Sequence, residues 1–466
     1  MLSSDLSPVP SLPSFAAEKS LREKPIVLNH SELSRRAILR GAALTGAGAV
    51  ASGLPFVGAA SAQSTLQWPE VTRMVESYVA ERKVSGMVAT LGFGQRVAQT
   101  VAAGTRAFDS RDAVGPDSLF RIYSMTKPIT GMAAIMCIQD GLLGLDQPLA
   151  EILPAFANMQ VQKTYDGAIT ADNLEPAARQ ITIRHLLTHT AGLGYGIVQQ
   201  GPIAEAMATR GLVPGQVSRL QTLPMFRGTP VGSLAAFADG IAQLPLVYQP
   251  GTKWSYSVAL DVLGRVIEVV SGMAFDVFLK QRIFDPCGMT STFFRVPASE
   301  ASRLTASYFL LQGMPLPIDP PASSIFLDEP PFPFGGAGLV SSGRDYDKFL
   351  QMLAGWGEID GVRVMSEPAV RLATTDLFPG TLAADGGFTS GGREFGFGAG
   401  GLVGRGDAAG LYGWFGAAGT AGLVNLRYGL RHNLMTQYMP STEYPLQNDF
   451  PLAVAADAAA LMRTAG

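Results

Sequence analysis

The sequence predicts an α/β fold in which both ends of the chain contribute to one sheet and a large helical insertion lies between them. Strand patterns occur near the start, at residues 86–103, and return as glycine-rich segments from about 336 to 437. Between these regions, from about 125 to 330, helical patterns and proline- or glycine-rich loops dominate. The chain has 466 residues, of which 47% are hydrophobic, and this is enough for a large two-part fold.

The spacing of apolar residues in the individual segments predicts the helices and strands of this fold. Residues 68–82 are amphipathic at helical spacing, which predicts a helix. Residues 86–103 have the pattern of two short strands joined by a turn at 94–95. Residues 131–138 are apolar on every side, which predicts a buried helix. The segment 451–464 predicts a further helix near the end of the chain.

The N-terminal region resembles a twin-arginine export signal. Its segment 34–40, S-R-R-A-I-L-R, contains two arginines followed by apolar residues and a basic one, and a weakly apolar run follows at 41–58. Ala60-Ser61-Ala62 has the small-x-small form of a cleavage site, which predicts cleavage after Ala62. The alternative is an ordinary alanine-rich helix. We expect a periplasmic or secreted mature protein, and the twin-arginine export machinery as the partner of the precursor.

These patterns predict three regions along the chain. Residues 1–62 form the signal region, residues 63–125 and 335–466 form the α/β domain, and residues 126–334 form a mainly helical domain. After the signal region, no segment reaches the roughly 18 uninterrupted apolar residues of a membrane span. We therefore expect no stable membrane span.

Charge and cysteine content disfavour two further classes of protein. The formal net charge is −3 and only 16% of residues are charged, so a nucleic-acid partner is not expected. The two cysteines, Cys137 and Cys287, cannot form a disulfide framework. Cys137 lies in an apolar run, which favours a place in the core, and a single disulfide between the two stays open.

Ser124 and Lys127, in R-I-Y-S-M-T-K-P-I-T, form the candidate reactive pair. On a helix, positions i and i+3 face the same way, so the amine can reach the hydroxyl. A serine needs a base before it acts as a nucleophile. Lysine has a usual pKa of about 10.4, and burial disfavours its charged form. Because the buried segment 131–138 follows directly, the spacing predicts a serine nucleophile with a lysine base.

The histidines supply no competing base. Beyond the signal region the chain contains His185, His189 and His432, and it has no G-x-S-x-G nucleophile elbow. His185 and His189 have the i, i+4 spacing of two metal ligands, but no H-E-x-x-H glutamate or third ligand accompanies them. We therefore expect His189, with its neighbouring threonines, to hydrogen-bond a helix end before Gly192.

Several sequence blocks occur in a fixed order along the chain. They are F-R-I-Y-S-M-T-K-P-I-T, D-G-L-L-G-L-D-Q-P-L, I-T-I-R-H-L-L-T-H-T-A-G-L, P-G-T-K-W-S-Y-S and G-A-G-L-V-S-S-G-R-D-Y. In this order they resemble the serine β-lactamase-like family, which groups class C β-lactamases, DD-peptidases and family VIII carboxylesterases. The resemblance covers about residues 68–460. It implies a β-lactamase/transpeptidase-like fold, in which an antiparallel sheet flanked by helices is formed by both chain ends, and a large all-helical domain is inserted.

The resemblance also implies two further motifs beside the Ser/Lys pair. The second family motif is Y-x-N, and here Tyr256 is kept whereas Val258 stands in place of the asparagine. A tyrosine beside a Ser/Lys pair can pass a proton to the leaving group. The third motif is K-T-G or H-x-G on a strand that borders the site. Its best match is Trp414-Phe415-Gly416.

The third motif implies the substrate-binding residues Trp414, Gly416 and Ala417. The glycine lets a substrate approach the strand, and the N–H of Ala417 joins that of Ser124 in an oxyanion hole. Tryptophan carries no charge where β-lactamases and DD-peptidases have a cation, and Val258 lacks an amide. Both changes favour uncharged, apolar esters. A tryptophan here is typical of the family VIII carboxylesterases.

The sequence thus predicts a serine hydrolase, a carboxylesterase that cleaves small apolar esters through an acyl-enzyme on Ser124. Lys127 and Tyr256 act as general base and acid, and neither a metal nor an organic cofactor is needed. A β-lactamase, a DD-peptidase or an acyltransferase of the same fold are alternatives. Trp414 and Val258 argue against the first two. A non-catalytic ligand-binding protein is the remaining alternative, and it has no need of all three catalytic side chains.

Overall fold

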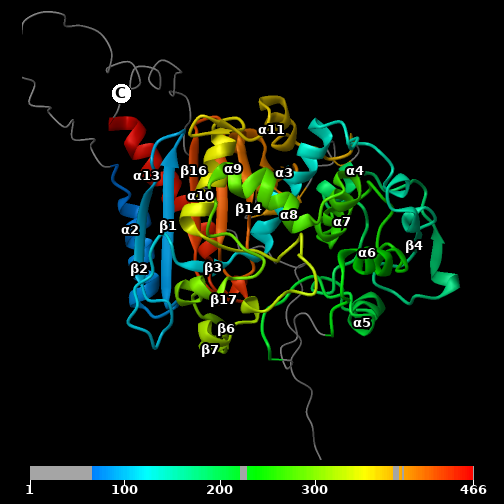
Figure 1. Cartoon of the computed structure of the whole chain (residues 1–466), viewed down its shortest axis with the longest axis horizontal. Coiled ribbons are helices and arrows are strands. Elements are labelled where there is room, and N and C mark those ends of the chain that lie inside the picture. Colours follow the sequence, from blue (N-terminus) through cyan, green and yellow to red (C-terminus); the bar gives the residue numbers. More distant parts are fainter. Residues whose placement is uncertain (1–65, 221–227, 381, 383–387, 391–392, 465–466) are drawn as a thin grey trace, which may run out of the picture. The chain divides into compact units, whose positions relative to one another are not determined.

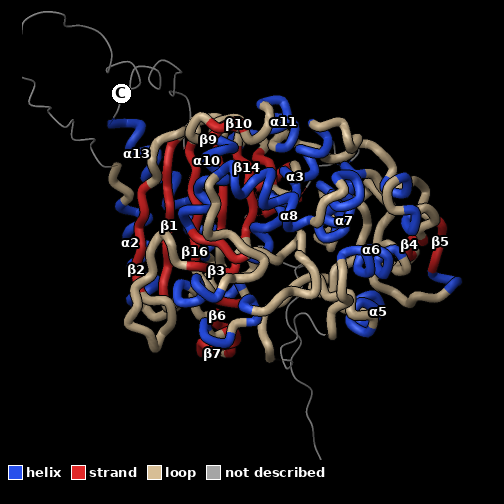
Figure 2. Tube along the Cα trace, viewed as in Figure 1, coloured by secondary structure: helices blue, strands red, loops and turns tan. Residues whose placement is uncertain are grey.

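An antiparallel sheet joins the two ends of the chain, as the strand patterns predict. The computed structural model describes residues 66–464 except 221–227, 381, 383–387 and 391–392. Within these residues the strands of the main sheet follow the order β11-β12-β13-β14-β15-β16-β1-β2. Figures 1 and 2 label β14, β16, β1 and β2 of this sheet. Their bounds are β1 Gly86–Phe93, β2 Gln99–Gly104, β11 Phe388–Ser390, β12 Arg393–Phe397, β13 Leu402–Gly404, β14 Leu411–Phe415, β15 Ala421–Asn425 and β16 Leu430–Met435.

Strand β1 forms the junction between the two chain ends. On one side it pairs with β2, and on the other side with β16, so that Val88 lies opposite Met435 and Phe93 lies opposite Leu430. In Figure 1 the blue first strands therefore lie beside the orange strands from the end of the chain. The predicted sheet from both ends is confirmed.

The helices cover the sheet and fill the middle of the chain. Their bounds are α2 Pro69–Ala80, α3 Thr126–Gln139, α4 Ile183–Leu187, α5 Pro202–Thr209, α6 Leu234–Ala242, α7 Ala259–Ser271, α8 Phe275–Leu279, α9 Asp285–Cys287, α10 Gly343–Ala354, α11 Glu367–Ala373 and α13 Leu446–Thr464. The predicted helices at 68–82, 131–138 and 451–464 correspond to α2, α3 and α13. Within the described residues, no helix is both long enough and apolar enough to cross a membrane.

Short strand pairs accompany the main sheet. They are β3 Leu119–Arg121 with β8 Val340–Ser342, β4 Gln160–Gln162 with β5 Leu174–Pro176, β9 Glu358–Ile359 with β10 Val362–Arg363, and β17 Tyr438–Met439 with β6 Ser307–Leu311 and β7 Met314–Asp319. The pair β3–β8 matters most for the site, because β3 leads directly into the segment that contains Ser124.

The sheet is buried on both faces, which explains the nearly continuous apolar run of β1. Successive side chains of a strand point to opposite faces. Met87, Ala89 and Leu91 pack in one core with α2 and α13, whereas Val88 belongs to the core on the other face. On that second face the packing includes α3, α7 and α10. The helix that follows Ser124 is thereby held in the larger core.

The predicted division into two domains stays a prediction. The sheet and the helices, up to Leu461 of α13, belong to one compact unit among the described residues. The predicted helical segment 126–334 contains α3 to α9, but also the strands β4 to β7. The predicted signal region, 1–62, lies outside the described residues. Cys137 and Cys287 are both free and buried, so they form no disulfide.

Two buried ion pairs join neighbouring elements of the fold. The Arg121 guanidinium contacts the Asp319 carboxylate, with both side chains almost inaccessible, and also donates to the Thr305 carbonyl. The Arg431 Nε lies 2.8 Å from the Asp347 carboxylate and links β16 to α10. A buried charge that loses its partner is strongly destabilising. The first pair fixes the end of β3, three residues before Ser124.

His432 gives the fold a defined sensitivity to acid. It lies on β16, is buried against Phe450 with the ring centroids 5.4 Å apart, and neither ring nitrogen has a hydrogen-bond partner among the described residues. Burial lowers its pKa from 6.5 to about 4. The unfolded chain therefore binds a proton before the folded chain does as the pH falls, so stability is lost from about pH 6.5 downward.

We predict that His432→Leu weakens this pH dependence. One titrating group contributes a slope of at most about 1.4 kcal/mol per pH unit to the free energy of unfolding. Denaturant unfolding of both proteins at pH 7.5 and pH 5.0 measures the effect. His185 and His189 are common to both proteins, so the difference belongs to His432. Equal slopes would contradict the prediction.

Candidate active site

Ser124 lies at the junction between strand β3 and helix α3. A 3-10 turn, Tyr123–Met125, connects the two elements and places the serine just before the first residue of the helix. Tyr123 has a φ of 41°, which is unusual for a bulky residue and costs about 1–3 kcal/mol. Its buried ring packs edge-on against Phe326 at 6.3 Å, which helps to hold this backbone in place. Ser124 keeps 9% of its surface exposed.

The Lys127 amine contacts the Ser124 hydroxyl, as the i, i+3 spacing predicts. Lys127 Nζ lies 3.2 Å from Ser124 Oγ and donates to the carbonyl of Gly336 at 2.7 Å. The lysine is fully buried. Its amine also lies 4.6 Å from the centre of the Tyr256 ring and 5.7 Å from that of Tyr195. The structure therefore brings the three predicted catalytic side chains, Ser124, Lys127 and Tyr256, into one cluster.

Two glycines allow helix α3 and the turn at 398–401 to pack closely beside Lys127. A Cβ at Gly131 of α3 would lie 2.1 Å from the carbonyl oxygen of Ala399, and one at Gly400 would lie 2.4 Å from that of Lys127. Real side chains do not approach so closely. The glycines at these positions allow the start of α3 to lie directly against the turn at 398–401.

Trp414 positions the phenol of Tyr256. The Trp414 indole N–H donates to the Tyr256 hydroxyl at 3.2 Å, from strand β14 across to the loop before α7. The centroids of these two rings lie 5.7 Å apart, and the Trp254 ring stacks on the tyrosine at 6.1 Å with an interplanar angle of 27°. Tyr256 itself is half-buried. The third-motif tryptophan therefore contacts the second-motif tyrosine, which the sequence motifs do not state.

Gly416 brings the end of β14 against the nucleophile segment. A Cβ at this position would lie 2.5 Å from the Ile122 carbonyl oxygen and 2.0 Å from Thr420 Oγ1. Ala417 follows and packs in the same apolar cluster as Tyr123. Among the backbone hydrogen bonds found outside regular helices and strands of the described residues, none is donated by the Ala417 N–H or the Ser124 N–H. Their role as the two donors of an oxyanion hole stays a prediction.

Aromatic side chains form the wall of the site beside Tyr256. Phe397 contacts Trp414 at 5.1 Å, and the cluster continues through Phe378 and Leu402. Such faces are apolar and offer van der Waals contact rather than charge. Val258 is fully buried in the main core, so the position of the family asparagine provides no polar group here.

The two histidines of the H-L-L-T-H block have separate structural partners. His185 accepts a hydrogen bond from the Thr182 N–H at 3.2 Å and closes the N-terminal cap of α4. Thr188 bonds the end of α4 through the Arg184 carbonyl, and the His189 backbone N–H donates to the Leu186 carbonyl at 3.4 Å, as expected. The His189 ring contacts the Ser257 hydroxyl at 3.0 Å and lies 4.8 Å from the Tyr256 ring.

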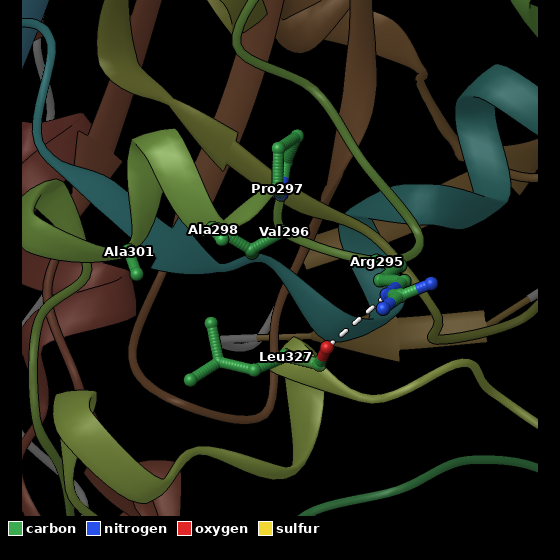
Figure 3. Close-up of a pocket in the computed structure, with 6 residues that line it drawn as sticks. All are labelled: Arg295, Val296, Pro297, Ala298, Ala301 and Leu327. Carbon is green, nitrogen blue, oxygen red and sulfur yellow. Dashed lines mark hydrogen bonds between the residues drawn. The ribbon is translucent and has the colours of Figure 1, made fainter.

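A surface pocket elsewhere does not belong to this site. It has a volume of about 390 Å³ and lies between the segment 295–301 and Leu327, where Arg295 Nε donates to the Leu327 carbonyl at 3.2 Å (Figure 3). Its lining residues are Arg295, Val296, Pro297, Ala298, Ala301 and Leu327. None of the predicted catalytic or substrate-binding residues is among them, and the pocket holds no nucleophile with a base.

The antiparallel sheet and the Ser/Lys pair at the start of a buried helix define the serine β-lactamase/transpeptidase-like class. A family model described as Beta-lactamase matches residues 71–457. The chain belongs to this β-lactamase family, as the sequence blocks predict. Among solved structures, EstCE1, described as a hydrolase with promiscuous acyltransferase activity, has a TM-score of 0.65 at 23% identity, over 83% of this chain and 97% of its own. At this identity the likeness shows the fold alone.

Relatives in sequence include proteins named for both hydrolysis and acyl transfer. Protein Rv1367c of Mycobacterium tuberculosis is 37% identical over 63% of this chain and 68% of its own length. Lovastatin esterase of Penicillium rubens is 34% identical, and acyltransferase calJ of Penicillium decumbens is 29% identical. These matches cover 51% and 54% of this chain, but only 55% and 56% of the two relatives. They support a serine hydrolase or acyltransferase of this fold.

No sequence pattern predicted some of the residues in the site. Tyr195, Asp261 and Phe397 lie in patterns that resemble any buried segment, and no spacing connects them to Lys127. The paired glycines at 335–336 did carry a signal, since two adjacent glycines after F-P-F often mark a close backbone approach. The sequence alone, however, does not indicate which segment approaches these two glycines.

We predict that Gly416→Ala reduces both stability and activity, because the added methyl group must displace Ile122 or Thr420. Overpacking of this kind costs about 1–3 kcal/mol. Gly232→Ala is the matched control, since a Cβ there meets nothing within 4 Å and φ is ordinary. It should change stability by no more than about 0.5 kcal/mol. Thermal unfolding measures the stability of each variant, and ester turnover measures its activity. If the two variants were equally stable and equally active, the close approach at Gly416 would be refuted.

Proposed function

We propose that this chain is a serine carboxylesterase that cleaves small, uncharged, apolar esters through an acyl-enzyme on Ser124. The observation that carries the proposal is the buried contact between Lys127 Nζ and Ser124 Oγ, at 3.2 Å, beside the ring of Tyr256. A hydroxyl with a buried amine as neighbour has the base that a serine nucleophile needs. The family and the names of the relatives in sequence agree with this reaction class.

The proposed reaction begins with attack by Ser124 Oγ on the ester carbonyl carbon. Lys127 accepts the proton of the hydroxyl, and the N–H groups of Ser124 and Ala417 donate to the oxyanion that develops. Tyr256 passes a proton to the oxygen of the departing alcohol and takes in exchange the proton held by Lys127, and Trp414 holds its phenol in position. Water then attacks the acyl-enzyme and gives a proton to the Lys127–Tyr256 pair, and the pair returns a proton to Ser124 Oγ as the acid leaves. This sequence needs no cofactor.

The apolar wall supports the choice of ester over β-lactam or cell-wall peptide. At the third motif the aromatic face of Trp414 replaces the cation that helps to bind a substrate carboxylate in the other family members. Phe397 extends this face. A site of this kind strips water from a carboxylate without compensating its charge, which is unfavourable. It accepts an uncharged ester at no such cost.

The proposal includes export of the mature protein. The S-R-R-A-I-L-R segment and the small-x-small site at Ala60-Ser61-Ala62 support a twin-arginine signal cleaved after Ala62, and hence a periplasmic or secreted enzyme. N-terminal sequencing of protein recovered outside the inner membrane tests the cleavage position. A first residue other than Gln63 would remove that part of the proposal.

Acyl transfer to an alcohol is the second candidate function. The observation that favours it is the 29% identity with a protein named acyltransferase. Both candidates share the acyl-enzyme, and they differ only in whether water or another alcohol releases the acyl group.

We predict that the purified chain hydrolyses p-nitrophenyl butyrate, with little turnover of a chromogenic cephalosporin, and that Ser124→Ala abolishes the ester activity. Initial rates on both substrates measure this. The same assay with added 1-butanol, followed by gas chromatography of butyl butyrate, separates hydrolysis from acyl transfer. Dominant cephalosporin turnover would keep the nucleophile but overturn the argument from Trp414. If neither substrate were turned over and a fluorophosphonate did not label the protein, the proposal that the chain is an enzyme would be overturned.

We predict that Tyr256→Phe lowers kcat for the ester by about 10²–10⁴, which is the usual contribution of a general acid or base. Tyr195→Phe is the matched control. Its ring also faces Lys127, but the residue is 1% exposed, whereas Tyr256 is half-buried and open to a substrate. Steady-state kinetics of the two variants decide the matter. Equal losses would mean that Tyr256 has no special part in proton transfer.

A further inference from the structure

A buried carboxyl group lies behind the Ser/Lys pair and has no part in the reaction sequence proposed above. Asp261 is in the first turn of α7 and is only 1% exposed. Its Oδ1 accepts a hydrogen bond from the backbone N–H of Gly336 at 2.9 Å. None of the ion pairs found within the described residues includes Asp261. Buried carboxylates usually have a paired cation, so this one needs an explanation.

Gly336 connects the carboxyl group to the catalytic amine. Its N–H donates to Asp261, and its carbonyl accepts from Lys127 Nζ at 2.7 Å. The lysine in turn contacts Ser124 Oγ at 3.2 Å. A continuous hydrogen-bonded path therefore runs from the carboxyl group through one residue of backbone to the nucleophile.

The backbone that carries this path is clamped between two helices. We call residues 335–336 the glycine strap. Thr130 Oγ1 of α3 donates to the Gly335 carbonyl at 2.7 Å. A Cβ at Gly335 would lie 2.5 Å from the Leu260 carbonyl oxygen, and one at Gly336 would lie 2.6 Å from Asp261 Oδ2. Only glycine permits this approach, so the position of the strap depends on α7 as much as on α3.

Charge connects the same groups. Burial raises the pKa of Asp261 to about 7, and the positive charge of Lys127 opposes this rise. Tyr195 also faces the carboxyl group, and burial, Tyr256 and Asp261 together raise the pKa of its phenol. His189 faces Lys127 from the other side, and burial and the lysine charge lower its pKa. The carboxyl group thus changes its charge in the neutral range, with the amine as the cation that acts on it.

We propose that Asp261 is a positioning residue for the Ser124–Lys127 pair, which holds the amine in place through the glycine strap and acts on it through its buried charge. The inference rests on the proposed function, since a neutral amine matters only if it accepts the Ser124 proton. A carboxylate stabilises the ammonium form of a nearby lysine, and a neutral side chain does not. Substitutions can test separately the hydrogen bonds that position the amine and the charge of the Asp261 carboxylate.

Asp261→Asn removes the charge and keeps an oxygen that accepts from Gly336. We expect its rate of labelling by a fluorophosphonate to reach half of its maximum at a pH about one unit lower than in the wild type, the lower end of the effect of a nearby charge. Thr130→Val loosens the glycine strap and keeps the charge. We expect it to lower the rate at every pH, by up to about 100-fold, without moving the half-maximal pH.

The experiment measures fluorophosphonate labelling of the full chain between pH 5 and 10. Asp345→Asn is the matched control, because Asp345 is also a buried carboxyl group that accepts a backbone N–H, that of Ser291 at 2.5 Å, and Lys127 is not among the charges that act on it. Its profile should coincide with that of the wild type. If Asp261→Asn does not fold, Asp261→Ser removes the same charge with a smaller side chain and gives the same comparison.

The outcomes separate this inference from the proposed function. A labelled wild type whose profile coincides with that of Asp261→Asn would overturn the role of Asp261 and leave the serine hydrolase intact. A wild type that is not labelled at any pH would overturn the proposed function, and the inference with it. A shift for Asp261→Asn, with none for Asp345→Asn, supports the inference, since a merely structural residue would change the rate but not its pH dependence.

Discussion

The buried amine of Lys127 is the constraint on which the rest of the site depends. An amine removed from water needs hydrogen-bond partners, and here they come from the serine hydroxyl and from the glycine strap. Both partners belong to segments that must approach the start of α3 closely, and glycines at each meeting point make this possible. The geometry of the nucleophile is therefore set by core packing rather than by loops on the surface.

The apolar surroundings of the cluster have two effects that reinforce each other. Aromatic rings from β12, β14 and the loop before α7 fix the orientation of Tyr256, because each ring is itself packed against the next. They also keep the local dielectric low, so that the charges of the lysine and of Asp261 act on each other more strongly than they would in water. The same aromatic side chains thus orient Tyr256 and strengthen the interaction between the charges of Lys127 and Asp261.

Local patterns predicted much of this arrangement. The sheet from both chain ends, the helices α2, α3 and α13, and the Ser124–Lys127 pair follow from spacing within one element or from motif order. The contacts of Trp414 with Tyr256, and of Lys127 with Gly336, join residues far apart in the chain, and periodicity contains no information about them. The positive φ of Tyr123 was equally unpredictable, because a bulky residue rarely adopts it.

The central place of β1 in the sheet has a consequence for how the protein is made. β1 is synthesised long before its partner β16, because most of the described chain lies between the two strands. Until β16 has been synthesised, one edge of β1 therefore has no neighbour, and an unpaired edge invites association with other nascent chains. Closing the sheet also joins residues separated by most of the sequence, which slows folding. The edge of β1 that pairs with β16 therefore stays exposed for as long as the residues between the two strands are being synthesised.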